Sequence, residues 1–320
     1  MSVFRDRVNV LSVAAASVAV TSLYPTDAAV IMSVEPESGR VHVGARADLD
    51  GYGDEFPEAV RSMVSQMPDV GAGVVVVFGT LDKAQEVAAA LADDLLVAVR
   101  VNLVMACTAD AVFVEESGEF VEISPVPLYD TEQFAAYETT GMATRQTRAD
   151  LVRDHQPLKA DVSSPLAGPI IDADLLLGAA DRPAELLREA DALVARVRQE
   201  SGAVSESDAA LLGAMCLTTA RRDALMVAID REDAVAVSEA LRALATRLSG
   251  PDAVHALAVC GLAYWISGRG ALAGVAIEVA EQTGGKSTLL PLVDDLRSSS
   301  VMNPKEVWPA LRAKMRANIG

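Results

Sequence analysis

The sequence predicts a protein of two parts: an α/β first half with a mixed sheet, and an all-α second half of tetratricopeptide-like helical hairpins. Three observations support this division. Short apolar runs typical of strands occur before residue 125. Beyond residue 182 the apolar residues recur at helical spacing. Between them, the stretch 156–169 is rich in Pro, Ser and Ala, and it is predicted to link a domain at 1–155 to one at 170–320.

The first half is predicted to consist of helices packed on short strands. Strands are predicted from alternating or continuous apolar runs at 28–34, 40–47, 74–78, 111–115 and 119–123. Helices are predicted from apolar residues at helical spacing at 8–20, 56–67, 81–104 and 131–140. Turn-forming residues at 35–39 and at Ser117-Gly118 join neighbouring strands into two hairpins. We therefore expect a mixed sheet covered by helices.

The second half is predicted to be helical throughout, with helices at 183–200, 206–229, 232–248, 252–266, 271–282, 287–298 and 304–317. Short connections favour antiparallel neighbours. The segment 255–282 has the spacing of one tetratricopeptide unit, and small residues such as Gly261 and Ala273 would let its two helices approach closely. We expect Trp265 to lie in this core, and Trp308 near the chain end to contribute less to stability.

The charge balance excludes some classes of partner. The formal net charge is −18, and a field of that sign repels phosphate backbones and anionic lipids. Direct binding of nucleic acid or of a membrane is therefore not expected. The hydrophobic fraction of 51% indicates a packed globule rather than a disordered chain. A protein partner, for which a basic one would suit the charge, and a homo-oligomer are both compatible with this composition.

The chain start and the cysteines indicate a cytoplasmic protein. Arg5 and Arg7 precede an apolar stretch at 8–20, as in a signal peptide, but Asp6 lies among them and no clean cleavage site follows. No apolar run reaches the ~20 residues that span a bilayer. The cysteines are odd in number and lie in apolar runs, which favours buried thiols in a reducing compartment: Cys107, Cys216 and Cys260.

No catalytic residue, cofactor site or metal ligand is predicted. The stretch 284–288, Gly-Gly-Lys-Ser-Thr, resembles part of a phosphate-binding loop, but Ala280 occupies the first glycine position and a helix replaces the preceding strand. The histidines have no nucleophile or orienting acid nearby in sequence: His42, His155 and His255. The doublets 93–94 and 294–295 are two aspartates each, and they point about 100° apart on a helix, which favours solvated faces over an ion site.

An acidic hairpin is the most unusual feature of the sequence. Residues 101–144 contain no Lys or Arg, whereas the second hairpin and its turn carry four glutamates: Glu115, Glu116, Glu119 and Glu122. Their positions differ in parity, so both faces of the hairpin, or else its turn, must carry charge. One interpretation is a charged edge that blocks pairing between sheets of different molecules. The other is a docking surface for a basic partner, with these four residues as its contacts.

Several motifs together resemble the family called domain of unknown function 4192, which occurs in actinobacteria and their phages. The resemblance is carried by three regions, 10–33, 74–80 and 258–308. The last is the most specific: Trp265 and the Gly-Arg-Gly-Ala-Leu run at 268–272 match its signature, and Pro304 and Trp308 match its ending. Arg222-Asp223 matches a pair in a mid-domain helix. Arg222, Asp223, Trp265, Gly268, Gly270 and Trp308 are thus implied to be structural signature residues.

One stretch departs from that resemblance. The family it resembles usually has an arginine followed by two aromatic residues and then clustered cysteines after the second hairpin. Here residues 118–123 read Gly-Glu-Phe-Val-Glu-Ile, and 124–130 contain no cysteine. Any metal or redox work of that cluster is therefore not expected in this chain, and the family implies no activity of its own.

Three functional interpretations remain at this point. The first is a non-enzymatic protein-interaction or regulatory protein of a bacterial or phage-infected cytoplasm. The second is an enzyme whose site lies between the domains and shows no motif, which a deep pocket with convergent polar groups would favour. The third is an acidic mimic of nucleic acid that binds a DNA-binding protein, which carboxylates spaced like phosphates would favour.

Overall fold

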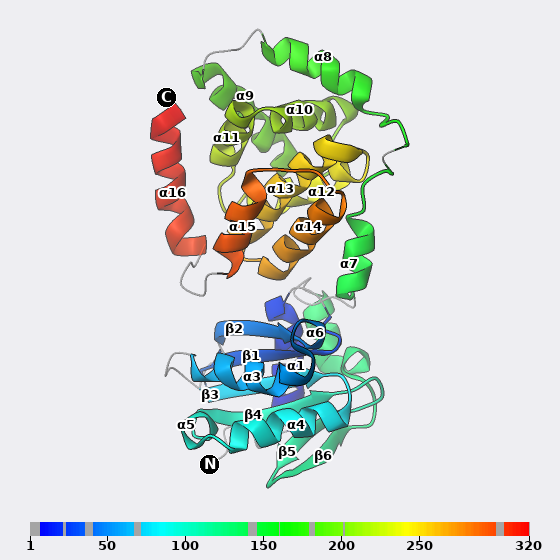
Figure 1. Cartoon of the computed structure of the whole chain (residues 1–320), viewed down its shortest axis with the longest axis vertical. Coiled ribbons are helices and arrows are strands. Elements are labelled where there is room, and N and C mark those ends of the chain that lie inside the picture. Colours follow the sequence, from blue (N-terminus) through cyan, green and yellow to red (C-terminus); the bar gives the residue numbers. More distant parts are fainter. Residues whose placement is uncertain are drawn as a thin grey trace. The chain divides into compact units, whose positions relative to one another are not determined.

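A computed structural model describes residues 7–21, 24–35, 41–66, 72–139, 146–159, 161–178, 183–200, 202–298 and 304–319. The chain divides into two compact units, Met1–Arg148 and Ala149–Gly320 (Figure 1). The first is an α/β unit with a mixed sheet, and its described residues beyond 131 and those of the second unit form helices joined by short segments. The predicted fold class is confirmed at this level.

The first unit is built on a six-stranded sheet in the order β2-β1-β3-β4-β5-β6. Its strands are β1 (Ala28–Val34), β2 (Val41–Asp48), β3 (Ala72–Phe78), β4 (Val101–Cys107), β5 (Val112–Glu116) and β6 (Glu119–Ser124). Only β3 and β4 run parallel within this described sheet, and the other neighbours are antiparallel. Both predicted hairpins are present, although most of the predicted turn at 35–39 lies outside the described residues. The strands β2 and β6 form the two edges.

Helices cover both faces of this sheet (Figure 1). On one face, α1 (Arg7–Thr21), the short turn η2 (Leu128–Asp130) and α6 (Glu132–Thr139) pack against the even-numbered side chains of β1 and β3, such as Val30 and Val76. On the other face lie α3 (Phe56–Ser65), α4 (Leu81–Ala92) and α5 (Leu95–Ala98). The links α2 (Leu49–Tyr52) and η1 (Gly53–Glu55) lead into α3. Helices cover β3 on both faces of the sheet, and its run of valines accordingly presents apolar side chains to both faces.

The predicted helix over 81–104 is wrong in its second part. The helix α4 ends at Ala92, α5 ends at Ala98, and β4 begins at Val101 and runs parallel to β3. Asp94 accepts the backbone N–H of Leu96 at 2.9 Å, which starts α5 as a separate turn. The apolar run 95–107 has no periodicity that separates a buried strand from a buried helix.

The second unit is helical over its described residues. Its helices are α7 (Arg148–Asp154, which begins at the last residue of the first unit), α8 (Ala167–Gly178), α9 (Pro183–Gln199), α10 (Glu206–Leu217), α11 (Thr219–Ala228), α12 (Ala234–Ala245), α13 (Gly250–Ile266), α14 (Gly270–Gln282), α15 (Leu289–Ser298) and α16 (Pro304–Ile319). At the centre is α13, in which every residue from 256 to 266 is buried. A Cβ on Gly261 would lie 3.5 Å from the carbonyl oxygen of Ala273, so α13 and α14 approach closely, as their small residues predict.

Two features of this unit were not expected from the sequence. The predicted helix 206–229 is two helices, because Thr218 has extended backbone angles and its hydroxyl accepts the N–H of Arg221 at 3.4 Å. In addition, the stretch 156–169 belongs to the second unit. Leu158 donates its N–H to the carbonyl of Leu248 at 2.8 Å, the hydroxyl of Ser164 donates to the carbonyl of Arg247 at 2.7 Å, and Leu166 is fully buried.

No helix among the described residues is long and apolar enough to cross a bilayer. The three cysteines are free and buried. Burial raises the pKa of each thiol, to about 12 for Cys216, where the nearby Arg222 acts in the opposite direction. These thiols therefore stay protonated at neutral pH and behave as small apolar side chains.

Candidate functional site

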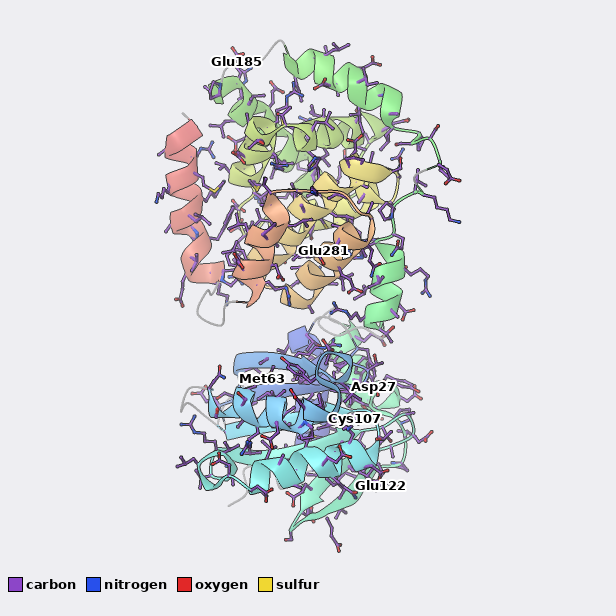
Figure 2. All side chains as sticks on the ribbon, in the orientation of Figure 1. Asp27, Met63, Cys107, Glu122, Glu185 and Glu281 are labelled. Carbon is purple, nitrogen blue, oxygen red and sulfur yellow. The ribbon has the colours of Figure 1, made fainter. Side chains whose placement is uncertain are left out.

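The acidic hairpin occupies one edge of the sheet. In the register of β5 and β6, Glu116 lies directly opposite Glu119, while Glu122 faces Phe113 and Glu115 faces Phe120. Side chains of opposed residues share a face, so each face of the hairpin carries two glutamates. Figure 2 labels Glu122 on the outermost strand. Of the two expected distributions, both faces or the turn, the register produces the first.

The carboxylates of this hairpin have no counter-ion in the part of the chain that the structure describes. None of the four glutamates forms an ion pair with a described residue, and Glu115 accepts only the N–H of Gly118 across the turn. Like charges directly opposite each other destabilise a hairpin, and Glu116 and Glu119 are such a pair. The edge thus holds negative charge that nothing in the described part of the chain neutralises.

A second polar cluster lies where α11 begins. The break at Thr218 places Arg221 and Arg222 in the first turn of this helix, and both are buried. Arg221 forms an ion pair with Asp174 on α8. Arg222 forms none with its neighbour Asp223, whose pKa is raised by burial and lowered less strongly by Arg222.

The hydrogen-bond partners of the Arg222 guanidinium come from three elements. Its Nη1 donates to Nδ1 of His255 on α13 at 3.3 Å. Its Nη2 donates to the hydroxyl of Thr219 at 3.3 Å and to that of Thr288 at 3.4 Å. All three acceptors are neutral, because an imidazole nitrogen that accepts a hydrogen bond carries no proton.

The loop 284–288 is held against α13, and this explains Gly285. It joins α14 to α15, so a helix precedes it where a phosphate-binding loop requires a strand. A Cβ on Gly285 would lie 2.6 Å from Cγ2 of the buried Val254, so only glycine allows this close approach. The approach brings Thr288 to Arg222, whereas Lys286 is exposed and contacts no described polar group.

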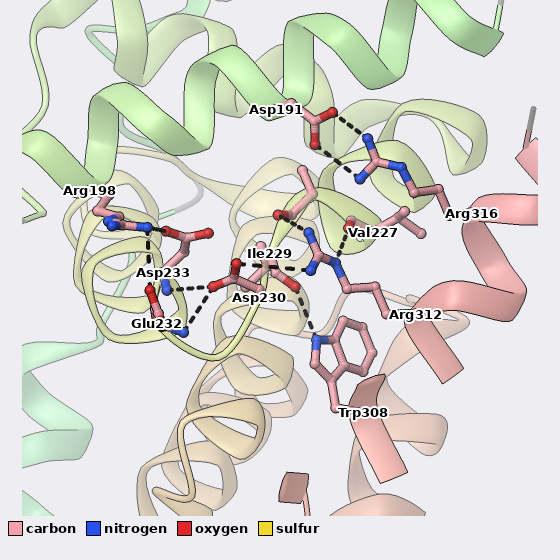
Figure 3. Close-up of polar contacts among 11 residues, drawn as sticks. Asp191, Arg198, Val227, Ile229, Asp230, Glu232, Asp233, Trp308, Arg312 and Arg316 are labelled. Atoms are coloured by element: carbon pink, nitrogen blue, oxygen red, sulfur yellow. Dashed lines mark hydrogen bonds and ion pairs between the residues drawn. The ribbon is translucent and has the colours of Figure 1, made fainter. Parts of the chain in front are cut away.

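The remaining signature residues are structural in their surroundings. Trp265 and Trp308 are 3% and 2% exposed, and their rings meet edge to face at 6.5 Å between centroids. The Trp308 indole donates to the carbonyl of Ile229 at 3.0 Å (Figure 3). Gly268 has a φ of +85°, which suits glycine, in the turn to Gly270 at the start of α14. Burial therefore gives no reason to expect a smaller contribution from Trp308 than from Trp265.

The other candidate groups take part in local structure. Asp294 pairs with Arg297 one helical turn later, at 2.7 Å. His155 is buried: its Nδ1–H donates to the carbonyl of Leu151 at 2.7 Å, while its Nε2 has no partner among the described residues. Burial lowers the pKa of His155. The side chain of His42, on β2, is outside the described set. No cluster of three metal-ligating side chains occurs in the part of the chain that the structure describes.

The sequence singled out Arg222, but not that its charge has no counter-ion among the described residues. The doublet Thr218-Thr219 was the available signal, because threonine is a preferred N-cap residue and predicts a helix start inside the apparent helix 206–229. The convergence of Thr219, His255 and Thr288 on Arg222 depends on how three helices pack. No local pattern in the sequence reports it.

Comparisons with known proteins identify a family and no closer relative. No curated protein and no solved structure matches the chain. The sequence model of one family, described as a domain of unknown function (DUF4192), matches residues 19–302. The match contains the acidic hairpin and the Arg222 cluster and ends before α16, so Pro304 and Trp308 lie outside it. Because it covers most of the chain, the protein belongs to the DUF4192 family.

Proposed function

We propose that this protein is a non-enzymatic interaction protein of the bacterial cytoplasm, and that the β6 edge binds a basic, extended segment of a partner protein. The observation that carries the proposal is the position, on an edge strand, of carboxylates that pair with no described cation. Glu119 and Glu122 lie on β6, which has β5 on one side and no strand of the described sheet on the other.

An edge strand binds an extended segment through its backbone. The N–H and C=O groups on the outer side of β6 are available to a further strand, which would add its own hydrogen bonds to the sheet. Val121 is 39% exposed between the two glutamates and offers an apolar contact. Lysine or arginine side chains of the added strand would then lie beside Glu119 and Glu122.

Charge complementarity selects the partner. A cation placed between Glu116 and Glu119 removes the repulsion of two carboxylates that face each other across the hairpin. Rim charges of this kind raise the rate of association more than the final affinity, and salt screens them over about 8–10 Å. Binding through this edge should therefore weaken as the ionic strength rises.

The test is photo-cross-linking in the native host from a photoreactive residue at position 121, compared between two charge-matched double variants. Glu119→Gln with Glu122→Gln removes two charges from the edge. Asp54→Asn with Glu55→Gln removes two exposed charges from the η1 turn, where neither side chain has a polar partner among the described residues.

We expect one partner to be cross-linked through a segment rich in Lys or Arg. The product should fall several-fold in the β6 double variant, because each exposed charge pair of this kind is worth ~0.2–1 kcal/mol. The η1 double variant should behave like the wild type. Cross-linking to a segment without basic residues, or equal yields from both double variants, would contradict the proposal.

A further inference from the structure

The Arg222 guanidinium is a buried cation without a counter-ion among the described residues. The residue is 5% exposed, and it forms no ion pair with any carboxylate in the described part of the chain. Removing a charge from water is costly unless an opposite charge compensates it. The adjacent Arg221 shows the usual solution, because it is buried and paired with Asp174.

The guanidinium also has donors to spare. Of its five N–H groups, three are used in hydrogen bonds of 3.3–3.4 Å to neutral acceptors, which are long bonds for a cation. Charge-assisted hydrogen bonds to an anion are typically 2.7–2.9 Å long and about twice as strong. The present partners therefore hold the side chain in place without satisfying its charge.

The surroundings of Arg222 favour an anion further. Thr219 is the first residue of α11, so the positive end of the helix dipole lies at the same place, where Thr218 already accepts one first-turn N–H, that of Arg221. Thr219 and Thr288 are both exposed residues, so two of the three hydrogen-bond partners of Arg222 lie at the surface of the unit. Lys286, also exposed, adds positive charge to the loop that carries Thr288.

We propose that Arg222, Thr219 and Thr288 form a binding site for a phosphate group on the second unit. The donors come from two separate elements, the start of α11 and the loop before α15, with the guanidinium beneath them. Such a fork of donors suits a tetrahedral group with oxygens in several directions better than a flat carboxylate. The site is independent of the acidic hairpin, which lies in the other unit.

His255 provides a direct readout of occupancy. Its Nδ1 accepts from Arg222, and its pKa is lowered by burial and by the charge of Arg222, against a smaller opposing effect of Asp252. A bound phosphate offsets the charge of Arg222, so it must raise the pKa of His255. The chain contains three histidines, which makes the resonance simple to assign by substitution.

The experiment is an NMR titration of His255 in the full chain against inorganic phosphate, at constant ionic strength. Parallel titrations use glycerol phosphate and a phosphoserine peptide, which distinguish a small-molecule source from a protein source, and acetate as the carboxylate. The variants are Arg222→Gln and the exposed-rim changes Thr219→Val and Thr288→Val. The matched control is Arg221→Gln, because that arginine is also buried but already paired with Asp174.

We expect phosphate to raise the pKa of His255, and Arg222→Gln to weaken phosphate binding at least about tenfold, as loss of a charge-assisted bond requires. Each threonine variant should weaken it several-fold, and Arg221→Gln should leave it unchanged. Stronger binding of glycerol phosphate or of the peptide supports the site and identifies its source. An unshifted His255, acetate binding as tight as phosphate, or full binding by the threonine variants would overturn the proposal even if Arg222→Gln fails to fold.

Discussion

Replacing Trp308 tests whether α16 is part of the core of the second unit. The side chain is 2% exposed, packs edge to face on Trp265, and donates its indole N–H to the carbonyl of Ile229 at 3.0 Å. Arg312 on the same helix donates to the carbonyls of Val227 and Ala228, at 2.7 and 3.2 Å, so α16 caps the end of α11 (Figure 3).

The magnitude follows from these contacts. Truncation of a buried tryptophan to alanine costs ~3–5 kcal/mol, which includes the aromatic pair. The variant Trp308→Phe keeps most of the buried ring but leaves the Ile229 carbonyl without its donor, at a cost of ~1–3 kcal/mol. In a unit of this size each kcal/mol lowers the melting temperature by about 2–4 °C, so Trp308→Ala should lower it by roughly 6–20 °C.

The assay is urea and thermal unfolding followed by tryptophan fluorescence. The chain has two tryptophans, and both lie in the second unit, so the signal reports the unfolding of that unit alone. Lys314→Ala is the matched control, since Lys314 is an exposed residue of the same helix. A Trp308→Ala protein that melts with the wild type, or a Trp308→Phe protein as unstable as Trp308→Ala, would refute this account of α16.

Three further predictions concern stability and folding. The pKa of His155 is lowered from its ordinary 6.5 by burial, so the unfolded chain takes up this proton first. The second unit should therefore lose stability as the pH falls below about 6.5. His155→Phe should reduce that loss, measured as the free energy of unfolding in urea at several pH values. An equal dependence of this free energy on pH in the variant and the wild type would contradict the prediction. Lys286→Ala should leave the melting temperature within about 1 °C of the wild type, because its side chain is exposed; a larger loss would contradict this. Expressed separately, Met1–Arg148 and Ala149–Gly320 should each unfold cooperatively in calorimetry, and a broad transition in either would refute their independence.

In the first unit, strands were predicted correctly from the sequence where the apolar pattern is unambiguous. The run of valines in β3, between two glycines, is too short for a helix, and its strand was predicted within two residues. The next strand was missed because the residues of β4 continue the apolar run of α5 without a turn signal. Only the pairing of β4 with β3 shows that the residues after Arg100 form a strand, whereas those before it form the short helix α5.

The candidate sites differ in the same way. The four glutamates of the acidic hairpin were predictable, because charge and strand alternation are local properties of the sequence. The Arg222 cluster was not predictable, because whether a carboxylate lies near a guanidinium depends on the three-dimensional packing of the helices. Predicting the cluster would require three features to be known together: the break between helices at Thr218, the close contact of Gly285 with Val254, and the packing of α11 against α13.

Hydrogen exchange of the β6 amides tests the central claim most directly. Amide exchange over Glu119–Ser124 would be compared in the full chain alone and in complex with the partner identified by cross-linking. Addition of a strand places outward-facing N–H groups of β6 in new hydrogen bonds, so binding by this edge predicts slower exchange there, while α9 in the second unit stays unchanged. Protection of other elements, with β6 exchanging as fast in the complex as in the free protein, would contradict it.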